Sequence, residues 1–522
     1  MKWSTQQSVF SSFSCRLSTF IALRTSPFDL FLLFPFYIMT WKISTVVVLA
    51  TLLPSAFANP SPSNLHQVCT KIQRAVSSSS TVFYPGSANY TADNAHWVSS
   101  STESSACTVE PGTAADVSVI LKLLGSNKTP FGVKGGGHIT NLGFSSTTGV
   151  QISMRRFSSV TYDTKSQTAE IGAGMIWDDV YTALEPHGVV VAGGRVSGVG
   201  VAGFVLGGGY SWLTNQVGLT VDTVAAYELV KPNGKIVSVT AQSDPDLFFG
   251  LKGGFNNFGI VTKFTLKTFP GSKFWGGVIA YGPDQIPAVE AALARFANKN
   301  TDPKAEIIAA CNFMNGSMQI DNIMFYDGPT PPSGVFDDFL NITSISKDVS
   351  TRSYLSVVQA GQVPAGARGA FHVATILDFT PTTIAAVVNE TTFWGNKLAA
   401  DGAFLVSYNI EPFLPSIYSH GAASAYPPVR NAGYLPINLN FAWTPAKSDA
   451  VFHSALKQSA LQLTDVAVHA GQAVAQAPLY TNYALADTPM ERMYGANLPR
   501  LRAIKARVDP GNVMGLAGGF KF

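Results

Sequence analysis

The sequence predicts an α+β protein with two parts of different character. Between about residues 106 and 270, short β-rich runs alternate with glycine-rich turns. Beyond Pro270, strand-like and helix-like segments follow one another in a regular order, which is typical of one antiparallel sheet covered by helices. Three glycine-rich loops, at 130–141, 193–210 and 253–259, imply an extended phosphate-bearing ligand held between strands of the first part.

The first part is expected to contain short strands and two helices. The helices are predicted at 114–124 and 175–185, and the second ends at Pro186 with Gly188 beyond it. The strands are predicted at 130–133, 150–154, 160–163, 168–171, 228–230 and 260–266.

The second part is expected to form an antiparallel sheet with helices on it. Its strands are predicted at 274–280, 305–312, 320–326 and 404–410. Its helices are predicted at 286–297, 383–400 and 447–463.

The first glycine-rich loop reads Lys134-Gly-Gly-Gly-His138. Consecutive glycines leave backbone N–H groups uncovered, and such a loop can close around an anionic group. The histidine that follows places an imidazole beside the bound group. By itself, a histidine next to glycine is more often an ordinary turn residue, so the other two loops carry the interpretation.

The second loop contains a misleading pattern. Gly198, Gly200 and Gly203 fit the dinucleotide fingerprint G-x-G-x-x-G, and Asp222 stands near the place of its ribose-binding acid. The fingerprint requires a helix after its last glycine. The glycines at 207–209 follow too soon for a helix to propagate, so we reject a nicotinamide cofactor.

Several motifs together resemble a known family. Segments 134–138, 199–210, 218–222 and 248–261 resemble the FAD-binding domain of vanillyl-alcohol-oxidase-type flavoproteins, and 480–483, 494–505 and 509–512 agree with the berberine-bridge-enzyme-like oxidase branch. The resemblance covers about 65–522 and is loosest between about 275 and 470. It implies a two-part flavin-binding domain of mixed small sheets and helices, at 65–270 and 471–522. A substrate domain, at 271–470, would be inserted between the two halves, with the active site between the domains.

The resemblance implies bound FAD and a set of residues that hold it. In the family the histidine after the glycines is bonded covalently to the flavin, and His138 has that place. Many relatives have a second linking cysteine where this chain has Val196, so a single covalent link is expected. The full set of expected cofactor-binding residues is Lys134, Gly135, Gly136, Gly137, His138, Asn141, Gly198, Gly200, Gly203, Gly208, Gly209, Gly259, Val261, Asn482 and Tyr483.

Tyr210 and Tyr480 match active-site tyrosines of the family and are the predicted catalytic residues. A phenol titrates near 10, so it needs a lowered pKa to act as a base. Many relatives have a tyrosine where this chain has Thr140, so part of the substrate platform differs. Asp378 and Glu411 are alternative acidic bases, although exposed or salt-bridged carboxylates are the more common reading of such residues. No ligand spacing predicts a metal site.

The resemblance implies an FAD-dependent oxidase that passes a hydride from an alcohol, an amine or a ring C–H of a small molecule to the flavin. Oxygen would reoxidise the flavin and give hydrogen peroxide. A carbohydrate oxidase remains an alternative, as does a dehydrogenase with another acceptor. Trp394 and Trp443 in the substrate segment would suit sugars, whereas its many Phe and Leu residues favour small aromatic or alicyclic substrates. A redox-silent glycoprotein that keeps the flavin fold is the non-enzyme alternative.

Composition indicates a secreted protein. Read from Met39, the N-terminus has the form of a signal peptide that ends at Ala56-Phe-Ala58, and an N-terminal anchor is the alternative. Removing residues 1–58 takes away four basic residues and one acidic residue, so 31 of each remain. A neutral chain without basic blocks argues against nucleic acid or an anionic membrane as a partner.

Two further features suit an oxidising compartment. Cys69 and Cys107 bracket a Ser/Thr-rich segment as a disulfide would, and Cys311 is then unpaired and most simply a buried apolar residue. Sequons for N-glycosylation occur at Asn89, Asn127, Asn315, Asn341 and Asn389.

Overall fold

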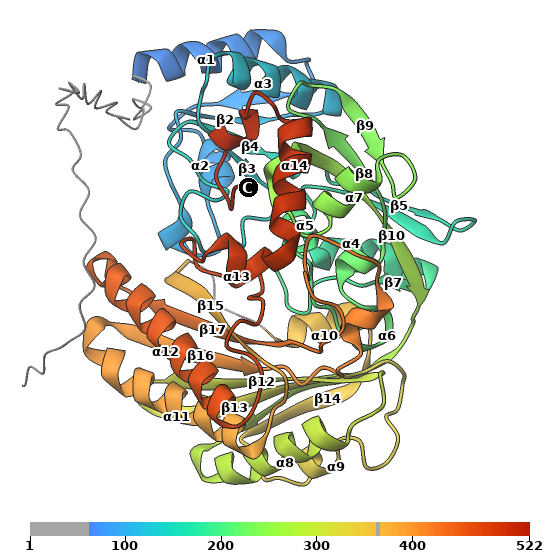
Figure 1. Ribbon diagram of the computed structural model, residues 1–522, viewed down its shortest axis with the longest axis vertical. Helices are drawn as coiled ribbons and strands as arrows, with labels where there is room; N and C mark the ends of the chain where they lie inside the picture. Colours follow the sequence, from blue (N-terminus) through green and yellow to red (C-terminus); the bar gives the residue numbers. More distant parts are fainter. Residues whose placement is uncertain (1–61, 362–365) are drawn as a thin grey trace, which may run out of the picture. The chain divides into compact units, whose positions relative to one another are not determined.

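The computed structural model describes residues 62–361 and 366–522, and two small sheets form the framework of its first part (Figure 1). The four-stranded sheet has the order β1-β2-β4-β3, in which only the β1–β2 pair is antiparallel. The antiparallel six-stranded sheet has the order β5-β6-β10-β8-β9, and β7 also pairs with β10. The strands are β1 (Thr81–Phe83), β2 (Cys107–Glu110), β3 (Phe131–Lys134), β4 (Val150–Ser153), β5 (Val160–Asp163), β6 (Thr168–Gly172), β7 (Val189–Val191), β8 (Val224–Val230), β9 (Ile236–Val239) and β10 (Ile260–Pro270).

Of the helices of this part, α3 and α4 lie where the sequence predicted them, and the others were not predicted. Helix α3 begins where the Thr113 side chain accepts a hydrogen bond from the backbone N–H of Asp116. The short helix α5 begins after Gly200 and contains Gly203, so Gly203 does not open a helix, and α5 ends after six residues, before the glycines at 207–209. The helices are α1 (Pro62–Ala75), α2 (Ala88–Asn94), α3 (Ala114–Ser126), α4 (Trp177–Leu184), α5 (Val201–Leu206), α6 (Thr214–Val217) and α7 (Pro245–Leu251).

The second part is the expected antiparallel sheet with helices on it. Seven strands have the order β14-β11-β13-β12-β16-β17-β15, and every neighbouring pair is antiparallel. Helices α8, α11 and α12 pack on one face of this sheet (Figure 1). The strands are β11 (Phe274–Tyr281), β12 (Ala305–Met314), β13 (Ser317–Tyr326), β14 (Ser346–Arg352), β15 (Arg368–Ile376), β16 (Ala403–Ile410) and β17 (Leu435–Trp443). The helices are α8 (Ile286–Lys299), α9 (Asp337–Leu340), α10 (Tyr354–Ala360), α11 (Pro381–Leu398) and α12 (Asp449–His469).

The C-terminal segment returns to the first part of the chain. Helices α13 (Met490–Tyr494) and α14 (Leu498–Val508) lie beside the small sheets and not on the large one (Figure 1). The Asn141 amide donates to the backbone oxygen of Ala484 at 2.8 Å, and the Tyr494 hydroxyl donates to that of Gly253 at 3.0 Å. The large sheet is therefore built by a segment inserted into the chain of the first part.

Aromatic side chains join the first part to the large sheet. Trp212 stacks on Phe325 of β13 with ring centroids 5.5 Å apart, and Tyr181 of α4 meets Tyr354 of α10 edge to face at 4.7 Å. Trp212 is fully buried and Tyr354 is nearly so. These two buried ring contacts pack the first part of the chain against the seven-stranded sheet.

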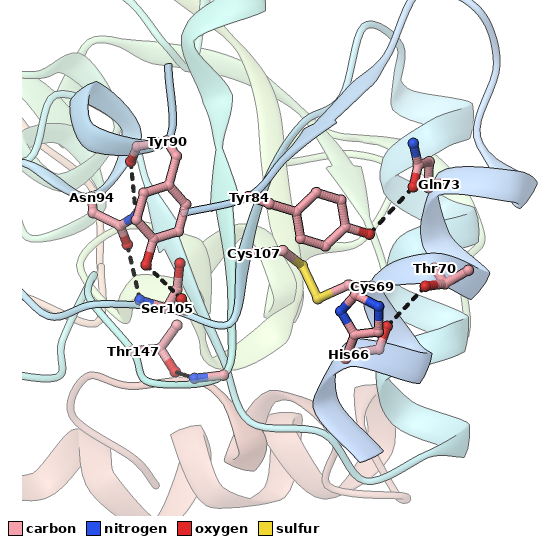
Figure 2. Close-up of a disulfide and its surroundings, with 11 residues drawn as sticks. His66, Cys69, Thr70, Gln73, Tyr84, Tyr90, Asn94, Ser105, Cys107 and Thr147 are labelled. Carbon is pink, nitrogen blue, oxygen red and sulfur yellow. Dashed lines mark hydrogen bonds between the residues drawn. A yellow bond between two sulfur atoms is a disulfide. The ribbon is translucent and has the colours of Figure 1, made fainter. Parts of the chain in front are cut away.

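Cys69 of α1 and Cys107 of β2 form a disulfide that pins the first helix to the four-stranded sheet (Figure 2). Beside it, the Tyr84 hydroxyl donates to the side chain of Gln73 at 3.3 Å. Cys311 of β12 is free and buried, as expected. The disulfide closes a chain segment of 38 residues.

The remaining expectations about secretion concern the surface and the N-terminus. The predicted leader, residues 1–58, lies outside the described residues. Within the described ranges, no helix has the length and apolar character needed to span a membrane. Among the asparagines of the sequons, Asn127 is half-buried and the other four are exposed, namely Asn89, Asn315, Asn341 and Asn389.

Candidate active site

A cavity of about 590 Å³ lies between the glycine-rich loops and one face of the seven-stranded sheet. On one side it is lined by residues of the three predicted loops and of α5. On the other side it is lined by alternate residues of β11, β12, β13, β16 and β17. Tyr480, Tyr483 and Phe520 of the C-terminal segment complete the wall. Residues from all parts of the described chain therefore meet in one space.

The first two glycine-rich loops touch each other through their backbones. A Cβ atom on Gly136 would lie 2.5 Å from the Cα of Gly200, so neither position has room for a side chain. Gly203 lines the cavity and has no atom within 4 Å of the place where its Cβ would be. The loops thus form a narrow wall of bare backbone, which suits the phosphates of a dinucleotide cofactor.

His138 stands at the edge of this wall with one nitrogen free. Its ring stacks on Trp97 with centroids 4.4 Å apart, and Phe371 of β15 lies 6.3 Å away. Its Nδ1 is buried and has no hydrogen-bond partner among the described residues. Burial lowers the pKa of the ring to about 4, so the imidazole is neutral at pH 7. A neutral ring with an unpartnered nitrogen in a cavity wall fits covalent attachment of a flavin at this residue.

Most of the residues predicted to bind the cofactor line the cavity. They are Gly135, Gly136, Gly137, His138, Gly200, Gly203, Gly259, Val261, Asn482 and Tyr483. Lys134, Asn141, Gly198, Gly208 and Gly209 do not line it.

The residues outside the lining support the loops from behind. The ammonium of Lys134 donates to the backbone oxygens of Ala92 and Asp93 at 2.8 and 3.2 Å, and burial lowers its pKa to about 8. The backbone N–H of Gly198 donates to the carboxylate of Asp178 at 2.8 Å. Gly208 has φ +124°, which an L side chain rarely adopts. These positions hold the shape of the loops.

Tyr480 is a buried phenol whose oxygen already accepts two hydrogen bonds. The backbone N–H of Gly209 donates to it at 3.0 Å and the side-chain amide of Asn482 donates at 2.9 Å. Burial raises the pKa of this phenol, so it is neutral at pH 7. Because both lone pairs are engaged, the free function of Tyr480 is its own O–H donor.

Tyr210 also lines the cavity, but its proton is engaged. Its hydroxyl lies 2.5 Å from that of Tyr418, and Tyr418 donates its only proton to the backbone oxygen of Tyr434 at 2.8 Å. Tyr210 must therefore be the donor to Tyr418. Burial raises the pKa of Tyr210 well above its usual value, which does not favour a role as base.

A buried carboxylate faces the loops from the sheet. Glu411 follows β16, is 1% exposed and lines the cavity. The Arg195 guanidinium donates to its Oε2 at 2.6 Å, and the Tyr483 hydroxyl lies 3.5 Å from its Oε1. Burial raises the pKa of Glu411, and Arg195 opposes part of this increase. A carboxylate with a raised pKa and one nearly free oxygen is suited to accept a proton from a substrate.

Arg195 is held rigidly in the second loop. Its side chain is 6% exposed and packs over the rings of Phe413 and Trp212, at 5.2 and 5.8 Å from their centroids. The Trp212 indole donates to the backbone oxygen of Arg195 at 3.3 Å. Burial also raises the pKa of nearby Glu306 well above its usual value, and among the described residues the carboxylate that forms an ion pair with Arg195 is Glu411.

Three other sequence candidates lie away from the cavity. Asp378 follows β15, and its backbone N–H and oxygen bond to the Gln472 side chain. Trp394 and Trp443, considered above as signs of a sugar groove, do not line the cavity, and the Trp443 indole donates to Asp449 instead. No cluster of three or more His, Cys, Asp or Glu side chains suited to a metal ion occurs in the part of the chain that the structure describes.

Sequence reasoning missed Arg195, Trp97 and the polar side chains of β17. Arg195 is a single arginine directly after two glycines in an apolar segment, which was a usable signal. Its partner Glu411 is 216 positions further along the chain, and no local pattern joins the two.

Two family models match the chain. Residues 105–240 match the model described as FAD binding domain, and residues 479–517 match the one described as berberine and berberine like. The first covers the loops at 130–141 and 193–210, and the second covers Tyr480, Asn482 and Tyr483.

Relatives and solved structures agree with these matches. An uncharacterized FAD-linked oxidoreductase of Arthroderma benhamiae is 40% identical over 49% of this chain, and the match spans only about half (51%) of that protein's length. The FAD-dependent monooxygenase sdcF of Emericella nidulans is 30% identical over 80% of this chain and 90% of its own length. Among solved structures, 6-hydroxy-D-nicotine oxidase from Arthrobacter nicotinovorans superposes with a TM-score of 0.71 at 21% identity, over 85% of this chain and 98% of that one.

Proposed function

The chain belongs to the berberine-bridge-enzyme-like family of FAD-linked oxidoreductases, and from this premise we propose that it is a secreted oxidase of a small molecule. The substrate would lose a hydride and a proton from an alcohol, an amine or a ring C–H, and oxygen would be the final acceptor, giving hydrogen peroxide. One observation carries the proposal: a single cavity has the glycine loops and His138 on one wall and the buried carboxylate of Glu411 on the other.

FAD, when bound, would supply the acceptor for the hydride and then the electrons that reduce oxygen to hydrogen peroxide. The residues that would hold it are the backbone of Gly135–Gly137, Gly200 and Gly203, together with His138. We propose a single covalent link at Nδ1 of His138, which is unpartnered and neutral. Val196 lines the same cavity but has no thiol for a second link.

Residues of the opposite wall would accept the proton that the substrate loses together with the hydride. Oε2 of Glu411 is engaged by Arg195, so Oε1 is the atom that would accept the proton of the substrate hydroxyl or amine. The free O–H of Tyr480 would donate a hydrogen bond that orients the reacting group. Tyr210 would hold the adjoining wall through its bond to Tyr418. This arrangement assigns the base to Glu411 and an orienting role to Tyr480.

Oxygen uptake by the purified holoenzyme tests the reaction type. Sugars, benzylic alcohols and cyclic amines would be screened, with hydrogen peroxide measured beside oxygen. An oxidase forms one peroxide per oxygen consumed and needs no added reductant. Oxygen consumption without peroxide, with an oxygen atom found in the product, would indicate the monooxygenase activity named for several relatives. Turnover only with an artificial acceptor would indicate a dehydrogenase.

The disulfide and the four exposed sequons support secretion. The mature protein is expected to begin at Asn59, which sequencing of the N-terminus would establish. A mature N-terminus upstream of Met39 would indicate an anchored protein instead.

A further inference from the structure

The sheet face that lines the cavity is unusually polar at its centre. Residues along a strand point alternately to the two faces. In β17 the buried residues Ile437, Leu439 and Phe441 alternate with Asn438 and Asn440. Only the two asparagines of this group line the cavity. The polar side chains of the floor, which we call the amide floor, are Asn312, Ser407, Asn409, Asn438 and Asn440.

The strand register arranges the amide floor in two rows. Asn312 of β12 is paired with Ser407 of β16, which is paired with Asn440 of β17. In the second row Asn409 of β16 is paired with Asn438 of β17. Neighbouring strands are about 4.8 Å apart, and residues on one face of a strand are about 6.8 Å apart. The floor is thus a grid of hydrogen-bonding groups with fixed spacing.

Part of this grid has no hydrogen-bond partner in the part of the chain that the structure describes. Asn438 is 3% exposed, and its Oδ1 accepts from the Asn409 amide at 3.2 Å, but its Nδ2 has no hydrogen-bond partner among the described residues. The side chains of Ser407 and Asn440 likewise make no hydrogen bond within the described ranges. Buried amides are normally paired, so free ones in a cavity wall indicate groups that bind a ligand.

The charged side chains of the cavity limit further which ligands it can bind. Apart from the neutral His138, the acidic and basic side chains among its described lining residues are Arg195, Glu411 and Asp321. Arg195 and Glu411 neutralise each other. Asp321 accepts hydrogen bonds from Asn312 at 2.9 Å and from Gln319 at 2.5 Å. No cation pairs with Asp321 among the described residues, and the cavity has no unpaired positive charge for a phosphate or carboxylate group of a substrate.

We propose that the amide floor binds a polyoxygenated ring, meaning a substrate with two or more hydroxyl or carbonyl oxygens away from the carbon that is oxidised. Primary amides both donate and accept, so they match neutral oxygen groups of either kind. The apolar residues between them, Ile308, Ala310 and Ile323, would contact the ring itself. This inference rests on the proposed function and specifies the substrate of the same site.

Paired ligands that need not react test it. Binding of phloroglucinol against phenol, and of myo-inositol against cyclohexanol, would be measured by calorimetry on the holoenzyme. We expect the oxygen-rich member of at least one pair to bind ten times more tightly or better. Tighter binding of phloroglucinol than of phenol would indicate an aromatic ring as the ligand. Tighter binding of myo-inositol than of cyclohexanol would indicate a sugar-like ring. Equal or undetectable binding of both members of both pairs would overturn the proposal.

The variant Asn438→Leu should remove this discrimination while phenol or cyclohexanol binds as before. Asn322→Leu is the matched control. Asn322 of β13 is fully buried, its side chain has no hydrogen-bond partner among the described residues, and it does not line the cavity. Asn440→Leu repeats the test should Asn438→Leu fail to fold. Retained discrimination in a folded Asn438→Leu or Asn440→Leu protein would refute the role of the floor. Because the ligands need not react, loss of oxidase activity alone would contradict only the proposed function.

Discussion

Replacing Arg195 by methionine tests the buried ion pair at the centre of the site. Methionine keeps an apolar stem against Trp212 and Phe413 but removes the guanidinium that donates to Glu411 at 2.6 Å. Both partners are at most 6% exposed, and removing one partner of such a buried pair costs about 3–5 kcal/mol. We expect this loss in the free energy of unfolding at pH 7.5.

The effect should depend on pH in a defined direction. Burial raises the pKa of Glu411 in the folded protein, so the native state binds this proton more readily than the unfolded chain does. The contribution of Glu411 to stability therefore falls as pH rises from the ordinary pKa of the carboxyl through its folded value. Without Arg195 the folded pKa rises further, so the variant should lose less stability at pH 5 than at pH 7.5.

Catalysis gives a second measurement of the same change. If Glu411 is the base, anaerobic reduction of the flavin requires its ionised form, and the acid limb of the pH–rate profile should move to higher pH in Arg195→Met. Arg295→Met is the control, because Arg295 pairs with Asp338 at the surface and should cost no more than about 1 kcal/mol. An unmoved acid limb together with equal losses at both pH values would refute the reasoning.

Three further predictions concern other residues of the site and the disulfide. His138→Ala should release FAD into the supernatant on acid denaturation, whereas the wild-type protein stays yellow in the precipitate; retained flavin in the variant would contradict attachment at His138. Tyr480→Phe should slow anaerobic flavin reduction at least tenfold with unchanged flavin content. Tyr210→Phe should lower the free energy of unfolding by about 1 kcal/mol and leave the rate of flavin reduction within a few-fold of the wild-type rate. Equal rates in the two variants would contradict the different roles given to the two tyrosines. Replacing Cys69 and Cys107 by serine should lower the free energy of unfolding by about 4 kcal/mol, from the 38-residue loop that they close, and denaturant titration would show whether the loss is smaller.

The sequence predicted local features better than long-range ones. The glycine-rich loops were found because glycine has a conformational role that other residues rarely fill. The end of α4 was found from Pro186 and Gly188, which follow it. Strand β17 was missed although Ile437, Leu439 and Phe441 alternate with polar residues. Pro436 cannot donate to a strand ladder, and its presence weakened the strand signal.

The chemistry of the site depends on partners that are distant in the sequence. Tyr210 was predicted as a catalytic residue because it matches an active-site tyrosine of the family, but its hydroxyl donates a hydrogen bond to Tyr418, 208 positions away. Glu411 and Asp378 were equal candidates in the sequence, and only the fold separates them. Burial and hydrogen bonding set the protonation of each group, and both are properties of the folded chain.

In β12, β16 and β17, neighbouring residues face opposite sides of the sheet, so evolution can act on them for different reasons. Every second residue packs under the helices, where its size and apolar character affect the stability of the fold. The residues between them face the cavity, where their hydrogen-bonding groups affect which ligand binds. Substitutions at 312, 407, 409, 438 and 440 can therefore change the accepted molecule while the hydrophobic positions between them remain fixed. Relatives with the same fold can in this way diverge in substrate through a few positions, and a library confined to these five positions would sample new specificities at little risk to folding.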